Sequence, residues 1–210
     1  MTSIAHTDLV PELAAVEVEG ISRQAFLVRG ALAAGAVYGT TMVSPFVRNA
    51  FAADGMGDID ILNFALTLEY LEADFYRRGL KLGLSSEVAK IAKSFGDAEQ
   101  QHVDALASTI KKLGGTPVKS PKFTFPMNDE KSFLKLAQTL EDTGVSAYNG
   151  AGPAITSKEV LAAAGSIVQI EARHAAVIRL LRGNVPAPDA FDPSLNTKQV
   201  LAAVKPLIRA

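Results

Sequence analysis

Two halves of this 210-residue sequence carry the same set of polar residues, and this internal repeat limits what the chain can form more than any other feature. In each half a glutamate is followed by a tyrosine after seven residues, a second glutamate after thirty and a histidine after thirty-three. The halves are offset by 72 residues at every one of these positions. The two sets are Glu69, Tyr76, Glu99 and His102, then Glu141, Tyr148, Glu171 and His174.

Apolar residues recur at helical spacing around these polar positions. The pattern predicts helices at 58–82, 86–113, 130–150, 157–182 and 197–205. The segment Thr156-Ser157-Lys158-Glu159 has the form of a capping box at the start of the fourth helix. A link rich in glycine and proline, 114–129, separates the second and third helices, whereas the links within each half are short. We therefore predict an all-α fold, a four-helix bundle with one long crossover and a short C-terminal helix.

The spacing within each half brings its polar residues to one level of the bundle. Residues three apart share a helix face, so each Glu-x-x-His motif directs a carboxylate and an imidazole the same way. About thirteen residues along one helix span roughly 20 Å, and a short turn followed by an equal length returns the chain to its starting level. Four helices would then deliver four carboxylates and two imidazoles to one height in the core.

Four buried carboxylates need positive charge, because burying one ionised carboxylate alone costs several kcal/mol. Two divalent cations would balance them, and neutral imidazoles would add ligands without charge. The sequence has no cysteine, which excludes thiolate ligands and disulfides. Carboxylate-rich sites favour iron, manganese, magnesium or calcium over zinc or copper. The alternative is a pair of core histidines that hydrogen-bond to neighbouring glutamates. We predict a dinuclear metal site built from Glu69, Glu99, His102, Glu141, Glu171 and His174.

This motif resembles that of the ferritin-like di-iron carboxylate superfamily, over residues 58–182. The stretch 62–72, LNFALTLEYLE, is similar to the opening helix of exported ferritin-like domain proteins, which include the desiccation-related group. The resemblance implies two metal ions, iron first and manganese as the alternative. It also implies bridging roles for Glu99 and Glu171, terminal roles for Glu69 and Glu141, and one metal each for His102 and His174.

Three further polar residues near this set have two interpretations each. Glu72 lies one turn beyond Glu69 and is either a ligand or, as we favour, a solvated carboxylate or one that hydrogen-bonds to a ligand. Its repeat counterpart is Gly144, so the repeat does not support ligation by Glu72. Tyr76 and Tyr148 either hydrogen-bond to ligands or are amphipathic core residues.

Residues 1–52 have features of an export leader. The stretch 22–27, SRQAFL, resembles the twin-arginine motif, with Gln24 at the second arginine position. Arg23 and Arg29 supply positive charge before an uncharged run at 30–47. Ala50-Phe51-Ala52 is a small-x-small cleavage pattern.

We expect cleavage after Ala52 and a periplasmic or cell-envelope protein whose ferritin-like domain covers 53–210. The alternatives are an uncleaved membrane anchor, since 18 uncharged residues just span a bilayer, and an intracellular N-terminal helix.

The charge balance gives no reason to bind nucleic acid, because 21 Lys and Arg face 22 Asp and Glu. Two function classes fit the predicted site. The first is an oxidase- or peroxidase-type protein that handles O₂ or peroxide in stress defence. The second is a structural or desiccation-protective protein with a structural or vacant metal site.

We expect 185–193 to form a strap over the bundle. Val200, Leu201 and Val204 of the last helix should pack on the bundle or on another subunit of a homo-oligomer.

Overall fold

The computed structural model describes residues 57–209. The leader expected at 1–52, with its uncharged run and cleavage pattern, lies outside the described residues. Within 57–209, none of the helices combines the length and the apolar character needed to cross a bilayer.

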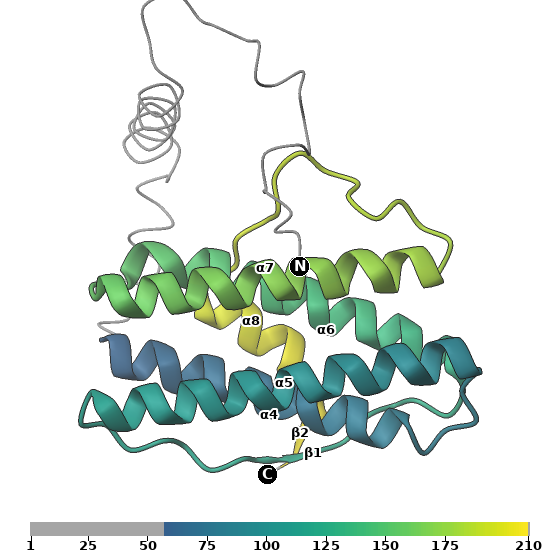
Figure 1. Ribbon diagram of the computed structural model, residues 1–210, viewed down its shortest axis with the longest axis horizontal. Coiled ribbons are helices and arrows are strands. Elements are labelled where there is room, and N and C mark those ends of the chain that lie inside the picture. Colours follow the sequence, from purple (N-terminus) through teal and green to yellow (C-terminus); the bar gives the residue numbers. More distant parts are fainter. Residues whose placement is uncertain (1–56, 210) are drawn as a thin grey trace, which may run out of the picture. The chain divides into compact units, whose positions relative to one another are not determined.

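The described chain is a bundle of four long helices with a short fifth helix (Figure 1). Helix α4 packs mainly against α5, and α6 packs mainly against α7, so each half of the sequence repeat is one helix pair. The all-α prediction is confirmed, and every helix end lies within three residues of its predicted position. The helices are α4 (Asp58–Gly79), α5 (Ser86–Lys112), α6 (Glu130–Ala151), α7 (Lys158–Leu181) and α8 (Thr197–Val204).

The start of α7 differs from the predicted capping box. Ser157 is the N-cap residue, and its hydroxyl accepts a hydrogen bond from the backbone N–H of Val160. Glu159 therefore lies one position too early in the helix to complete a capping box with this N-cap. Asp58, at the start of α4, accepts hydrogen bonds from the backbone N–H groups of Thr156 and Ser157, both at 2.8 Å. A carboxylate 98 residues away in sequence thus ties the start of α7 to α4.

The long crossover between α5 and α6 runs along the α4 and α5 side of the bundle (Figure 1). Within it, strand β1 (Lys122–Phe123) pairs antiparallel with β2 (Ile208–Arg209) near the C-terminus. Two residues are too few to show an alternating pattern, so the sequence predicts only a link here. The pairing attaches the C-terminal segment to the crossover. Single turns of 3-10 helix follow α6 and α8, at η1 (Gly152–Ala154) and η2 (Lys205–Leu207).

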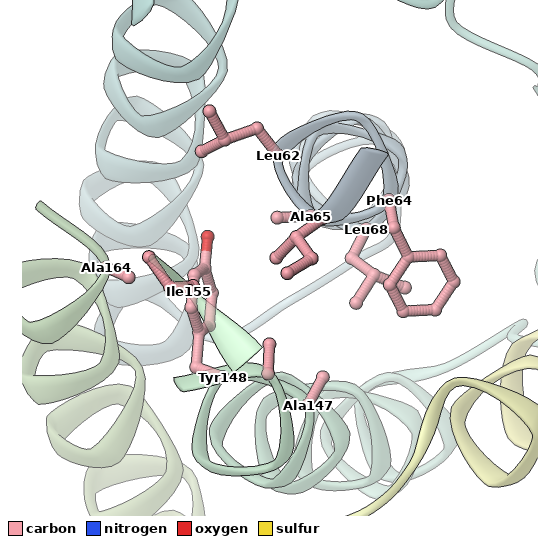
Figure 2. A pocket seen from close by; sticks show the side chains of 10 residues that line it. Leu62, Phe64, Ala65, Leu68, Ala147, Tyr148, Ile155 and Ala164 are labelled. Carbon is pink, nitrogen blue, oxygen red and sulfur yellow. The ribbon is translucent and has the colours of Figure 1, made fainter. Parts of the chain in front are cut away.

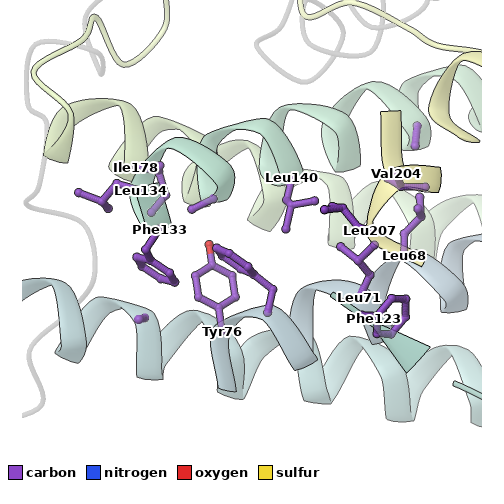
Figure 3. Packing of buried hydrophobic residues seen from close by; sticks show 14 of the residues in the cluster. Leu68, Leu71, Tyr76, Phe123, Phe133, Leu134, Leu140, Ile178, Val204 and Leu207 are labelled. Atoms are coloured by element: carbon purple, nitrogen blue, oxygen red, sulfur yellow. The ribbon is translucent and has the colours of Figure 1, made fainter. Parts of the chain in front are cut away.

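Helix α8 packs on its own bundle. Val200 and Val204 are buried in one cluster with Leu68 and Leu71 of α4 (Figure 3). Both valines are therefore covered by residues of this chain, and contact of α8 with another subunit stays a prediction. Leu201 is 43% exposed on the opposite side of α8.

Residues 183–196 lead from α7 to α8 with neither helix nor strand. Arg179 donates a hydrogen bond to the carbonyl of Pro186, and the N–H of Leu195 donates to the carbonyl of Ser146. These bonds hold the two ends of the segment, on α7 and on α6, and residues 187–194 between them are exposed. The strap over the bundle expected at 185–193 stays a prediction.

An aromatic cluster fills the bundle where α4 ends and α6 begins. Phe75 stacks on Phe133, with ring centroids 4.9 Å apart and an interplanar angle of 6°. Figure 3 shows Phe133 beside the ring of Tyr76. Gly79 lets the two helices approach, because a Cβ atom there would stand 2.2 Å from Phe133 Cε2.

We expect Gly79→Ala to lower the free energy of unfolding by about 1–3 kcal/mol, because the added methyl group overpacks this contact. The matched control is Gly165→Ala in α7, where an added Cβ would meet nothing within 4 Å. That change should raise the free energy of unfolding by about 0.5–1 kcal/mol through helix propensity. Urea unfolding of the metal-free protein, followed by circular dichroism, measures both. Equal effects of the two substitutions would contradict the close packing at Gly79.

Candidate metal centre

Each of the four long helices contributes to one buried polar cluster. Glu69 comes from α4, Glu99 and His102 from α5, Glu141 from α6, and Glu171 and His174 from α7. All four glutamates are fully buried. The structure therefore brings together all six residues that the repeat singles out.

Their ligand atoms form two overlapping groups, within each of which the atoms lie no more than 4.8 Å apart. The groups are Glu69, Glu99, His102 and Glu171, and Glu99, Glu141, Glu171 and His174. Glu99 and Glu171 belong to both. Each group could hold a cation, and the two positions would then share two carboxylates.

In the first group, one nitrogen faces three carboxylates. His102 Nδ1 lies 2.9 Å from Glu99 Oε2, 3.1 Å from Glu69 Oε2 and 3.2 Å from Glu171 Oε1. Three acceptors so close to one nitrogen surround a point that a cation can occupy.

In the second group, the atoms are close but do not hydrogen-bond to each other. His174 Nδ1 lies 2.8 Å from Glu99 Oε1 and 3.5 Å from Glu141 Oε2. None of these three atoms has a hydrogen-bond partner in the described part of the chain. Phe95 stacks on the imidazole of His174 at 3.8 Å between ring centroids, which fixes the ring orientation. The sequence indicates Phe95 only as a core residue.

Unpartnered buried polar atoms test whether a metal fits this site. Within 57–209 these atoms are Glu99 Oε1, Glu141 Oε2, both carboxylate oxygens of Glu171 and His174 Nδ1. A buried polar atom without a partner costs about 1–3 kcal/mol, and more when it is charged. All of them belong to the two four-residue groups. Carboxylate oxygens and imidazole nitrogens are ligands that iron and manganese accept, so the donor set fits.

The two tyrosines of the repeat bind the glutamates of the opposite half. Tyr76 on α4 donates a hydrogen bond to Glu141 Oε1 on α6. Tyr148 on α6 donates to Glu69 Oε1 on α4 at 2.6 Å. Of the two interpretations of these tyrosines, hydrogen bonding to the predicted ligands is the one observed. Each bond occupies one carboxylate oxygen and leaves the other facing the site.

Glu72 is a fifth carboxyl group beside the cluster. It is 3% exposed, so the interpretation as a solvated carboxylate is wrong. It belongs to neither of the two four-residue groups. A Cβ atom at Gly144 would stand 3.0 Å from Glu171 Oε2 and 3.3 Å from Glu72 Oε1. The missing side chain at Gly144 thus provides the space for both carboxyl groups, and a glycine at the repeat position of Glu72 is the sequence signal for this.

Burial dominates the electrostatics of the metal-free glutamates. It raises the pKa of Glu69 to about 7, and burial together with neighbouring carboxylates raises the pKa of Glu72 and Glu171 well above the usual range. Glu99 is the exception. Burial opposes its ionisation, but the nearby imidazoles of His102 and His174 lower its pKa to about 2.

The same carboxylates keep both imidazoles charged. Burial opposes the charge of His102, yet the nearby carboxylates of Glu171, Glu69 and Glu99 raise its pKa to about 12. Burial also opposes the charge of His174, whose pKa the neighbouring carboxylates raise to about 9. Without metal, the cluster therefore holds protons as its counter-charge.

The bundle and its shared-carboxylate cluster define a ferritin-like helical protein, and the comparisons with known proteins agree. Residues 57–184 match the sequence model of the ferritin-like domain, which is more than half of the chain. The chain belongs to the ferritin-like domain family. No curated protein matches it. Membership of the desiccation-related group stays a prediction.

Two solved structures show the same fold. One is a conserved hypothetical protein from Mycobacterium tuberculosis, at 18% identity and a TM-score of 0.56, covering 64% of this chain and 96% of that one. The other is a ferritin-like, diiron-carboxylate protein from Bacillus anthracis strain Ames, at 25% identity and a TM-score of 0.53, covering 59% of this chain and 94% of that one.

We expect metal binding to release protons, because a ligating imidazole must be neutral. The raised pKa values of His174 and His102, about 9 and about 12, mean that both are protonated at pH 7 in the metal-free protein. The apparent affinity for Mn²⁺ should therefore rise from pH 6 to pH 8, by about tenfold per pH unit for each proton released. Calorimetric titrations in buffers of different ionisation enthalpy count these protons. A pH-independent affinity would contradict ligation by the two histidines.

We expect Gly144→Ala to weaken metal binding by about 10- to 100-fold, because the added methyl group pushes the carboxyl group of Glu171 out of position. The helical content should be retained, since alanine favours a helix. Gly165→Ala, with open space around its Cβ, is the control and should bind metal like the wild type. Equilibrium dialysis with Mn²⁺ compares the three proteins. Unchanged binding by Gly144→Ala would show that the space at Gly144 does not shape the site.

Proposed function

We propose that the protein binds two ions of iron or manganese in this cluster and uses them to reduce dioxygen or peroxide. The observation that carries the proposal is the convergence of four buried carboxylates and two imidazoles on two groups of ligand atoms, five of which have no partner among residues 57–209. The similar Bacillus anthracis protein is described as a diiron-carboxylate protein, which supports iron as the first choice of metal.

Ligand roles follow from group membership. Glu99 and Glu171 are shared by both groups and would bridge the two ions. Glu69 and His102 would complete one position, and Glu141 and His174 the other. Six protein groups supply fewer ligands than two ions of five or six coordination require, so positions remain for a small oxidant.

Two bound divalent ions would supply one electron each, which with two protons converts O₂ to hydrogen peroxide, or hydrogen peroxide to two waters. The protein's own groups hold the site in shape. Tyr148 and Tyr76 orient the terminal glutamates Glu69 and Glu141 through their hydroxyl groups. Phe95 orients the ring of His174. The complete burial of the four glutamates keeps bulk water from them.

We further propose that this chemistry serves stress defence in the cell envelope. The support for that location is the leader-like sequence of residues 1–52, with its arginines, uncharged run and cleavage pattern. A structural or desiccation-protective role is the alternative, and it requires no turnover at the metal site.

We expect the full-length protein, reconstituted under reducing conditions with Fe²⁺ and Mn²⁺ together, to retain about two metal ions per chain. Glu99→Ala and His174→Ala should lose metal and reduce oxidant turnover to background, because each removes a ligand. The control is Asp142→Ala, which removes a carboxylate next to Glu141 that instead pairs with Arg179 at 2.5 Å.

Elemental analysis gives the metal content, and stopped-flow absorbance gives turnover with O₂ and with peroxide. No metal above background in the wild type, or full turnover in Glu99→Ala, would reject the proposed centre. The structural or protective role would then become the leading function.

A further inference from the structure

The two tyrosines that bind the glutamates have different surroundings, although the repeat relates them. Around Tyr76, the rings of Phe75, Phe95 and Phe133 lie at centroid distances of 5.1, 5.8 and 6.0 Å. Tyr76 itself is 1% exposed. This half of the site is sealed by close-packed aromatic rings.

Around Tyr148 the repeat counterparts of these rings are smaller. The offset of 72 residues places Ala147 where the other half has Phe75, and relates Phe133 to Ile61. A cavity lies beside Tyr148, and the centre of a water molecule could occupy about 20 Å³ of it (Figure 2). Its walls come from α4, α6 and α7 and the turn after α6, and include Ala65, Leu68, Ala147, Tyr148, Ile155 and Ala164.

The lining of this cavity favours an apolar occupant over water. A buried water needs two to four polar partners, and apolar cavities in proteins stay dry and take up small apolar molecules. The tyrosine hydroxyl is the one side-chain polar group among the lining residues, and it is already bonded to Glu69. The volume exceeds the roughly 10–15 Å³ that one water requires, which leaves room for a diatomic molecule.

The cavity is placed to serve the metal centre. Tyr148 forms part of its wall, and the hydroxyl of the same residue lies 2.6 Å from Glu69 Oε1. Most of the lining comes from α4, which carries Glu69, and from α6, whereas His102 lies on α5 and His174 on α7. The cavity therefore approaches the cluster from the side of α4 and α6. Phe64 and Ile155 also line the cavity and are partly exposed, so it lies near the surface there.

We propose that this cavity binds dioxygen and supplies it to the Glu69 and His102 side of the metal centre. The inference rests on the proposed function and narrows it, because a dry apolar cavity favours O₂ over peroxide, which carries two hydroxyl groups. The aromatic rings around Tyr76 close the corresponding route on the other side.

Dioxygen itself is the probe, since it is paramagnetic and speeds the relaxation of nearby methyl protons. The experiment compares alanine methyl relaxation in the full-length, metal-free protein under O₂ and under N₂. The repeat supplies internal controls: Ala65 and Ala164 line the cavity, and their counterparts Ala137 and Ala92 lie in the sealed half. We expect at least a twofold larger O₂ effect at Ala65 and Ala164. Equal effects within both pairs would overturn the proposal.

Ala147→Phe copies Phe75 of the sealed half and should fill the cavity, removing the extra O₂ effect. If this variant does not fold, Ala164→Leu fills the same space from α7. The control is Ala162→Phe, at an exposed position of the same helix. Persistence of the O₂ effect in a folded, filled variant would also reject the cavity as its origin.

The metal-loaded protein tests the supply of oxidant. In Ala147→Phe, the oxidation of the bound metal ions by O₂ should slow by about tenfold at unchanged metal content. In Ala162→Phe, the bound metal ions should be oxidised at the wild-type rate. Unchanged oxidation in a filled variant would overturn the supply role. Absence of any O₂ reaction in the wild type would instead reject the proposed function, and the methyl relaxation result, which needs no metal, would still decide whether the cavity binds O₂.

Discussion

The burial of four carboxylates at one level of the bundle is the constraint on which the rest of the structure depends. Two imidazoles supply the only positive charge among the residues of the two groups. Glu99 lies between both histidines and keeps its charge, with a pKa lowered to about 2, whereas burial raises the pKa of Glu69 to about 7. The carboxyl groups therefore compete for too little counter-charge, and two cations would resolve that competition.

The long-range bonds of the bundle follow from the same constraint. Ligand atoms can converge only if the helices keep their register, and each half contributes a tyrosine that binds a glutamate of the other half. Asp58 adds a polar tie at the end of the bundle, where it accepts from the backbone of Thr156 and Ser157. These bonds join residues 65 to 99 positions apart, so they fix the arrangement of one helix pair against the other.

The sequence is most informative where spacing alone determines position. Helical periodicity predicts all five helices of residues 57–209, and the offset of 72 residues predicts the six clustered residues. Helix geometry fixes the level and the face of each of these side chains. Features that depend on side-chain volume across helices are not predicted. In the sequence, Gly144 stands where the repeat would place a counterpart of Glu72. Only the packed bundle shows that the space left by its missing side chain holds the carboxyl groups of Glu72 and Glu171. The N-cap is Ser157, one residue later than in the expected capping box, and the backbone there donates to Asp58, a residue distant in sequence.

Comparison of the two halves of the repeat shows which residues of the site are identical and which of their neighbours differ. Charge balance and ligand geometry would act alike on two cation positions, and the glutamates, histidines and tyrosines are identical in the two halves. The surrounding pairs are not: Glu72 faces Gly144, and Phe75 corresponds to Ala147. Ligation alone would treat the two positions equally, so a difference in chemistry between them would have to come from unequal pairs such as these. One pair places an extra carboxyl group beside Glu171, and the other leaves space beside Tyr148 that its counterpart fills with a ring.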